Sequence, residues 1–246
     1  MLWMWIEALL VNAVLISFAQ RTPLLTTQGW IHAAALGTIL WGSLGWRGWL
    51  AVVVYLVVGS LVTRIGFKNK QRRGLAEARE GRRGPENVWG SAAVGAGLAL
   101  VLAASPENAI LWRQVVLIGF SASFAAKLAD TFGSEIGKRW GRTTLLITTL
   151  RPVAPGTDGA ISLEGTMASA AGSVVMTFAL WGLSSSQLPL IPNAMAAGVV
   201  MVVGLLATLA ESVMGAVVQN RAGWLSNELI NACLLYTSDA ADEGLG

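Results

Sequence analysis

Charged residues gather in one part of an otherwise apolar chain, and their spacing predicts phosphate and metal chemistry. The segment 127–138 combines lysines with carboxylates, and a glycine-rich turn follows at 155–162. At about 100° per residue, four polar side chains fall within about an 80° arc of one helix: Lys127, Asp130, Ser134 and Lys138. Ionisable groups at a membrane boundary are costly, so we expect this stripe to be functional.

Carboxylates in and after this segment are predicted to bind Mg²⁺. Asp130, Glu135 and Asp158 offer hard oxygen ligands, and Mg²⁺ completes its coordination with water and substrate phosphates. Lys127 and Lys138 would neutralise phosphate oxygens, since phosphoryl transfer depends mainly on positioning and charge stabilisation. The predicted catalytic set is therefore Asp130, Lys127, Lys138 and Ser134. The alternative is an ordinary solvated loop whose charges pair between neighbouring helical turns.

The turn at 155–159 reads Pro-Gly-Thr-Asp-Gly, a composition that exposes backbone N–H groups to an anion. It lacks the spacing of a Walker A motif. From this turn we predict four nucleotide-binding residues: Gly156, Thr157, Gly159 and Ser162. Gly133 and Gly137 form a Gly-x-x-x-Gly pair, which predicts a close contact with another helix.

A second basic segment covers residues 64–87, where lysines and arginines outnumber three glutamates. One interpretation is an anchor that binds anionic lipid headgroups. The other is a lid that clamps a triphosphate, and the interspersed Gly74, Gly81 and Gly84 suit the bending that a lid requires. Under the second interpretation the predicted nucleotide-binding residues are Arg72, Arg73, Arg82, Arg83 and Asn87. Glu211 is open to either a role in the site or helix packing.

Composition indicates the kind of scaffold that must position these groups. Of 246 residues, 54% are hydrophobic and 13% charged, and the mean hydropathy is +0.60. A soluble domain carries roughly a quarter charged residues, so the chain is predicted to be a polytopic membrane protein. A single cysteine and a single histidine exclude an intramolecular disulfide framework and a zinc site built from these residues.

Apolar runs of spanning length predict an all-α transmembrane helix bundle. About seven spans are expected, near 2–19, 29–46, 48–66, 88–104, 111–130, 166–184 and 193–214. They form one integral membrane domain over 1–231. The segment 232–246 turns abruptly polar and acidic, and we interpret it as an atypical, non-native tail.

The distribution of positive charge predicts the orientation of the bundle. With the N-terminus outside, only Arg47 and Arg113 of the 17 lysines and arginines lie on the outer side. The loops at 67–87, 131–165 and 215–228 then share the cytoplasmic face, where nucleotides are available.

Four segments carry a resemblance to a known family. They are Gly66-Phe-Lys with the Arg/Gly-rich loop after it, Ala129–Lys138, Pro155–Ser162 with Glu164-Gly165, and Ser212–Ala216 with Gln219. Over about 1–231 the chain resembles the membrane family that includes plant phytyl-phosphate kinase and animal transmembrane protein 19. The outline is also similar to dolichol kinases, phytol kinases and CDP-diacylglycerol synthases.

The resemblance implies a CTP-dependent, Mg²⁺-requiring kinase that phosphorylates a phytyl or prenyl monophosphate. Its expected partners are an isoprenoid lipid phosphate, a nucleoside triphosphate and membrane lipids, with no nucleic acid and with a homodimer as a possible assembly. A cytidylyltransferase that makes a CDP-lipid is the alternative enzyme. A membrane transporter or scaffold is the non-enzymatic alternative.

Overall fold

The computed structural model describes residues 2–77 and 79–219, and within them the chain is α-helical apart from one pair of two-residue strands. The helices are α1 (Leu2–Ala19), α2 (Thr27–Arg64), α3 (Phe67–Arg72), α4 (Pro85–Ala104), α5 (Ile110–Trp140), α6 (Leu163–Leu183) and α7 (Ala194–Met214). A 3₁₀ turn, η1, covers Arg79–Gly81, and a π-helical turn, η2, covers Gly215–Gln219. The prediction of an all-α fold is confirmed.

Among the described residues, five helices are long and apolar enough to cross a membrane: α2, α4, α5, α6 and α7 with its extension to Val217. The N-terminal helix α1 is apolar but shorter. The count differs from the expected number of about seven for two reasons: the span predicted at 2–19 is the shorter helix α1, and the spans predicted at 29–46 and 48–66 belong to the single helix α2. The C-terminal segment 232–246 lies outside the described residues.

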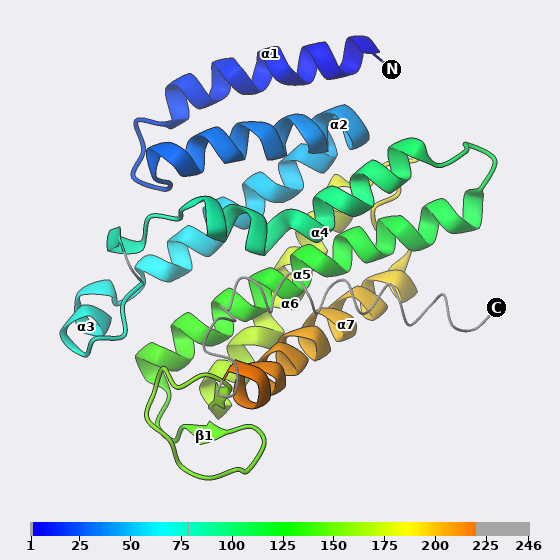
Figure 1. Ribbon diagram of the computed structural model, residues 1–246. Helices are drawn as coiled ribbons and strands as arrows, with labels where there is room; N and C mark the ends of the chain where they lie inside the picture. The colour runs from blue at the N-terminus through cyan, green and yellow to red at the C-terminus, as the bar shows by residue number, and fades with distance from the viewer. Residues whose placement is uncertain (1, 78, 220–246) are drawn as a thin grey trace.

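Helix α2 is bent sharply at Gly45. A straight helix of its 38 residues would be about 57 Å long, nearly twice the hydrocarbon thickness of a bilayer. Gly45 has φ 70° and ψ −172°, a conformation that glycine tolerates because it lacks a Cβ. The two arms fold back on one another (Figure 1), and Trp49 Nε1 lies 3.0 Å from the position of a Cβ built on Gly37. The predicted turn near residue 45 is therefore present without a loop.

Helix α5 lies at the centre of the bundle and contacts α2, α4, α6 and α7. Its side chains Phe120, Phe124 and Leu128 are almost fully buried. The backbones of α5 and α6 approach closely, because a Cβ on Gly133 would lie 2.0 Å from Ser169 Oγ. This contact confirms the prediction drawn from the Gly-x-x-x-Gly pair.

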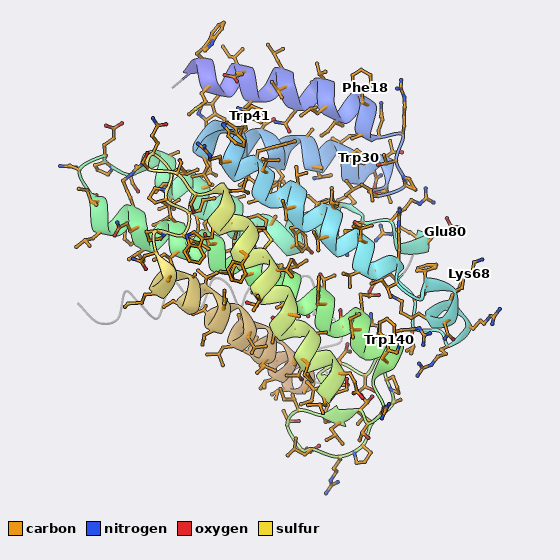
Figure 2. The ribbon with its side chains drawn as sticks, turned by 180° about the vertical axis from the view of Figure 1, so that it is seen from behind. Phe18, Trp30, Trp41, Lys68, Glu80 and Trp140 are labelled. Carbon is orange, nitrogen blue, oxygen red and sulfur yellow. The ribbon has the colours of Figure 1, made fainter. Side chains whose placement is uncertain are left out.

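The ends of several helices meet at the end of the bundle that carries α3 and the loop with β1 (Leu145–Leu146) and β2 (Ala160–Ile161), whereas the N-terminus lies at the other end (Figure 1). Helices α2, α5 and α7 end there, and α4 and α6 begin there. Figure 2 shows Lys68, Glu80 and Trp140 at this end, far from Trp41. With 31 residues, about 46 Å, α5 is long enough to carry its charged end beyond the apolar layer.

Candidate functional site

A cavity of about 440 Å³ opens among these helix ends. Ligand sites are typically concave and of this order of size. Five helices and two loops contribute to its lining, which carries Tyr55, Glu77, Arg79, Arg82, Arg83, Asn87, Ser91, Lys127, Asp130, Ser134, Glu135, Lys138, Gly156, Thr157, Asp158, Gly159, Ser162 and Glu211, among others. Segments that are far apart in the sequence thus form one polar cavity in an apolar bundle.

The glycine-rich turn forms one side of the cavity, held by the small sheet. Strands β1 and β2 pair antiparallel with Leu145 opposite Ile161, which fixes the turn just before α6. Gly156 and Gly159 have positive φ angles of 88° and 73°, which side chains with a Cβ rarely adopt. Among the described residues, the amides of Gly156, Asp158 and Gly159 donate no hydrogen bond. The turn therefore presents the unpaired N–H groups that an anion requires.

The first turn of α6 continues this side of the cavity. Ser162 caps the helix, because its hydroxyl accepts a hydrogen bond from Gly165 N at 3.1 Å. The positive end of the helix dipole faces the cavity and favours a negatively charged ligand. We call the turn Pro155–Gly159 together with Ser162 and the start of α6 the loop wall.

The four residues of the predicted polar stripe on α5 all line the cavity, as their spacing predicts. The lysines of the stripe are neutralised by glutamates. Lys127 Nζ lies 3.0 Å from Glu211 Oε2, and Lys138 Nζ lies 3.0 Å from Glu77 Oε1. A phosphate would therefore share these ammonium groups with carboxylates already in place.

Glu135 forms a buried ion pair with Lys70. Their side chains are only 3% and 1% exposed, and Lys70 Nζ also donates a hydrogen bond to Thr63 O at 2.7 Å. Lys138 approaches the same carboxylate at 3.6 Å. Because ion pairs occupy it, Glu135 connects α3 to α5 and is not free to bind a ligand.

The two aspartates of the cavity differ from its glutamates. Asp130 and Asp158 are half-buried, and neither forms a hydrogen bond or ion pair with any described residue. Asp130, Glu135 and Asp158, the three carboxylates predicted as metal ligands, do not form one cluster. Within residues 2–77 and 79–219, no group of three His, Cys, Asp or Glu residues is placed to hold a metal. One or two carboxylates suffice for Mg²⁺ when phosphates and water supply the other ligands, so Asp130 and Asp158 fit this ion.

The basic segment before α4 contributes a second part of the cavity lining. Arg79, Arg82 and Arg83 line it, whereas Arg72 and Arg73 do not. Arg73 instead donates a hydrogen bond to Lys138 O at 3.2 Å, and Arg72 is exposed. We call the segment Arg79–Arg83 together with the neighbouring side chains Tyr55 and Ser91 the arginine wall.

Contacts with the first turn of α4 stabilise the arginine wall. Arg79 forms an ion pair with Glu86. Asn87 lines the cavity, and its side-chain oxygen accepts a hydrogen bond from Gly84 N at 3.0 Å at the start of α4. Burial raises the pKa of Glu77, but the ammonium of Lys138, together with a hydrogen bond to Glu135 and the charge of Arg83, more than offsets this, so the pKa lies below its ordinary value.

Sequence reasoning missed Tyr55, Lys70 and Glu77 as members of this region. Tyr55 lies within an apolar stretch that reads as a lipid-spanning helix, and Lys70 is one basic residue among many. Glu211, which the sequence left open between two roles, lines the cavity as the partner of Lys127. A polar residue well inside an apolar span is the signal that could have drawn attention to Tyr55.

The sequence matches a known family of membrane proteins over most of its length. Residues 10–237 match the family described as integral membrane protein DUF92. The chain belongs to this family. The resemblance drawn from the four sequence segments is thus confirmed at the level of the family, and so is the prediction of an integral membrane protein.

Relatives of the chain come from distant organisms. An uncharacterized membrane protein of Synechocystis sp. is 44% identical over 244 residues, covering 98% of this chain and 91% of the relative. Protein VTE6, chloroplastic, of Arabidopsis thaliana is 37% identical over 233 residues, covering 92% of this chain and 67% of that protein. An uncharacterized membrane protein of Methanocaldococcus jannaschii is 29% identical over 225 residues, with 91% and 87% covered. No solved structure matches significantly.

Proposed function

We propose that this chain is a membrane lipid-phosphate kinase that transfers a phosphoryl group from a nucleoside triphosphate, CTP in the first instance, to an isoprenoid monophosphate. The observation that carries the proposal is the cavity, whose lining combines loop-wall amides, arginines and two aspartates, and within residues 2–77 and 79–219 those amides and aspartate side chains have no hydrogen-bond or ion-pair partner. Membership in the DUF92 family and the resemblance to plant phytyl-phosphate kinase support the choice of reaction.

In the proposed reaction an oxygen of the acceptor phosphate attacks the γ-phosphorus of the nucleotide. The new P–O bond forms as the bond from the γ-phosphorus to the β,γ-bridging oxygen breaks. A lipid diphosphate and a nucleoside diphosphate result. The acceptor is already anionic, so the site needs no strong base, and Ser134 serves at most to orient phosphate oxygens through its hydroxyl.

The residues of the cavity divide the remaining work. The amides near Gly156, Thr157 and Gly159 and the N-terminus of α6 at Ser162 hold the nucleotide phosphates. Lys127 and Lys138 balance negative charge beside the reacting groups. Asp130 and Asp158 would hold Mg²⁺, which when bound supplies charge neutralisation of the phosphates.

The proposal includes a topology. Each arm of α2 crosses the membrane, as does α1, so that seven apolar segments alternate from an N-terminus outside to a cavity on the cytoplasmic face. The excess of lysine and arginine at the cavity end supports this orientation. A transporter is disfavoured because the polar groups lie at one end of the helices, whereas transporter sites lie near the bilayer midplane.

The test uses the purified protein in detergent. We expect CTP with Mg²⁺ to raise its unfolding temperature, and addition of phytyl monophosphate to release CDP; UTP and ATP are compared in the same assay. Release of pyrophosphate would instead identify the cytidylyltransferase alternative. Absence of stabilisation by all three nucleotides would overturn the proposal in favour of a transporter or scaffold.

A further inference from the structure

Arg83 differs from the two lysines of the cavity because its guanidinium forms no ion pair with a described carboxylate; Glu77 is affected only at longer range, where the charge of Arg83 helps to lower the pKa of that carboxyl. Among the described residues no carboxylate lies within ion-pair distance of its guanidinium, whereas Lys127 and Lys138 each contact glutamate. Its Nη1 donates a hydrogen bond to Tyr55 Oη at 2.5 Å, and its Cζ lies 4.9 Å from the centre of the Tyr55 ring. The charge of Arg83 is held in place but left available to an anion.

The protein fixes Arg83 at both its backbone and its guanidinium. Its backbone N–H donates to Leu24 O and its carbonyl accepts from Thr26 N, both at 3.0 Å. Gly29 permits this approach, because a Cβ there would lie 2.6 Å from Arg83 O. At the other end, a Cβ on Gly59 would lie 2.8 Å from Arg83 Nη2. Arg83 therefore approaches two glycines closely, Gly29 with its backbone carbonyl and Gly59 with its guanidinium.

Tyr55 of α2 and Ser91 of α4 show how far the guanidinium of Arg83 reaches along these apolar helices. Tyr55 Oη donates to Ser91 Oγ at 2.8 Å, joining α2 to α4. Tyr55 lies about 13 Å from the end of α2 at Arg64, and Ser91 lies about 9 Å from the start of α4 at Pro85, at 1.5 Å per residue. An anion bound here would thus lie within the length of the apolar helices and not beyond their ends.

The two walls of the cavity belong to two different pairs of helices, and both pairs pack on α5. Helices α2 and α4 pack together on it, as do α6 and α7, and Asp130 of α5 lines the cavity that they share. Transfer between two phosphates requires two anion sites that face one reaction centre. The loop wall offers backbone amides, and the arginine wall offers a fixed guanidinium, which binds phosphate in a bidentate manner.

We infer that Arg83 and Tyr55 form the subsite for the acceptor, the monophosphate headgroup of a membrane lipid, while the loop wall binds the nucleotide. This inference rests on the proposed kinase function. Arg83 contacts the acceptor phosphate directly, and Tyr55 is a positioning residue that orients the guanidinium. The assignment moves Arg83 from the nucleotide, for which the sequence suggested it, to the second substrate.

The test compares two glycine-to-alanine variants of the full chain in detergent. Gly59→Ala displaces the guanidinium of Arg83, whereas a Cβ on Gly97 of α4 meets no atom within 4 Å. We expect Gly59→Ala to weaken binding of phytyl monophosphate, measured calorimetrically without nucleotide, by about tenfold, the effect of losing one charge-assisted contact. The KM for CTP should stay unchanged, and Gly97→Ala should match the wild type in both measurements.

Tyr55→Phe provides an independent variant that keeps the ring and removes the hydroxyl. We expect about fivefold weaker binding of phytyl monophosphate, again without a change in the KM for CTP. Unchanged lipid-phosphate binding in both variants, or an equal loss of CTP affinity, would overturn the subsite. If the wild type binds phytyl monophosphate through Arg83 but transfers no phosphate, the proposed kinase function fails and the subsite remains.

Discussion

The two walls of the cavity bind anions by different means. The loop wall uses backbone amides held in shape by glycines with positive φ angles, while the arginine wall uses a side chain held by Tyr55 and by backbone contacts with the α1–α2 connection. A backbone site tolerates changes of side chain but not of conformation. A side-chain site depends on the identity and orientation of one residue. Substitutions should therefore affect the two walls in separable ways.

The largest effect is expected where the two walls meet, at Asp130. Asp130→Asn should lower phosphoryl transfer by about 10³-fold, because it removes an electrostatic group at the reaction centre. The carboxylate has no hydrogen-bond or ion-pair partner among the described residues, so the unfolding temperature should change little. Turnover and thermal unfolding measured on the same preparation check both statements. Activity above a tenth of wild type would show that Asp130 is not an essential group of the reaction centre.

The ion pair that joins α3 to α5 should have the largest effect on stability. Lys70→Met leaves Glu135 as a buried charge without its closest partner, which should cost about 3–5 kcal/mol in the free energy of unfolding. Adding Glu135→Gln removes that charge and should recover much of the loss. Denaturant unfolding of the wild type, the single variant and the double variant measures the coupling. A double variant less stable than Lys70→Met would show that the pair does not act as a unit.

The loop wall is tested by its glycines. Gly159→Ala should strain a residue at φ 73° by about 1–3 kcal/mol, and its Cβ would lie 2.4 Å from Ala216 Cβ. Gly156→Ala introduces the same kind of strain but meets only the side chain of Leu75. Both variants should raise the KM for CTP, with Gly159→Ala the stronger, and leave binding of phytyl monophosphate unchanged. The opposite pattern would reverse the assignment of the walls.

The smallest effect concerns Glu77, whose lowered pKa follows from its pairing with Lys138. A carboxyl group with a lowered folded-state pKa stabilises the protein above its unfolded value of about 4.3, and the contribution is lost as the pH falls through the folded value. Since Glu77 is exposed, the contribution is small. Unfolding temperatures of wild type and Glu77→Gln should therefore differ at neutral pH and converge as the pH falls from about 4.3 through the lowered folded-state value.

Much of this arrangement could be predicted from the sequence. Helical periodicity brought Lys127, Asp130, Ser134 and Lys138 to one face, and the glycines of 155–159 indicated a phosphate-binding turn; both now line one cavity. Apolar length located the helices, but it could not show that one residue, Gly45, turns α2 back on itself.

The remaining features depend on tertiary contacts. Local spacing placed Glu135 beside Asp130, yet Lys70, distant in the sequence, pairs with Glu135, whereas Asp130 has no ion-pair partner in the part of the chain that the structure describes. Similarly, Arg72, Arg73, Arg82 and Arg83 look equivalent in a basic run. Arg82 and Arg83 line the cavity whereas Arg72 and Arg73 do not, and backbone pairing with Leu24 and Thr26 fixes Arg83 there. Patterns within one helix reveal a shared face but not which partner reaches it from elsewhere.

The central claim is that the cavity transfers the terminal phosphoryl group of a nucleotide to a lipid monophosphate. The most direct measurement supplies purified wild-type protein and phytyl monophosphate with CTP labelled either at the γ- or at the α-phosphate. We expect the γ-label to enter the lipid product and the α-label to stay in CDP. Entry of α-label into the lipid, or no labelled lipid from either nucleotide, would contradict it.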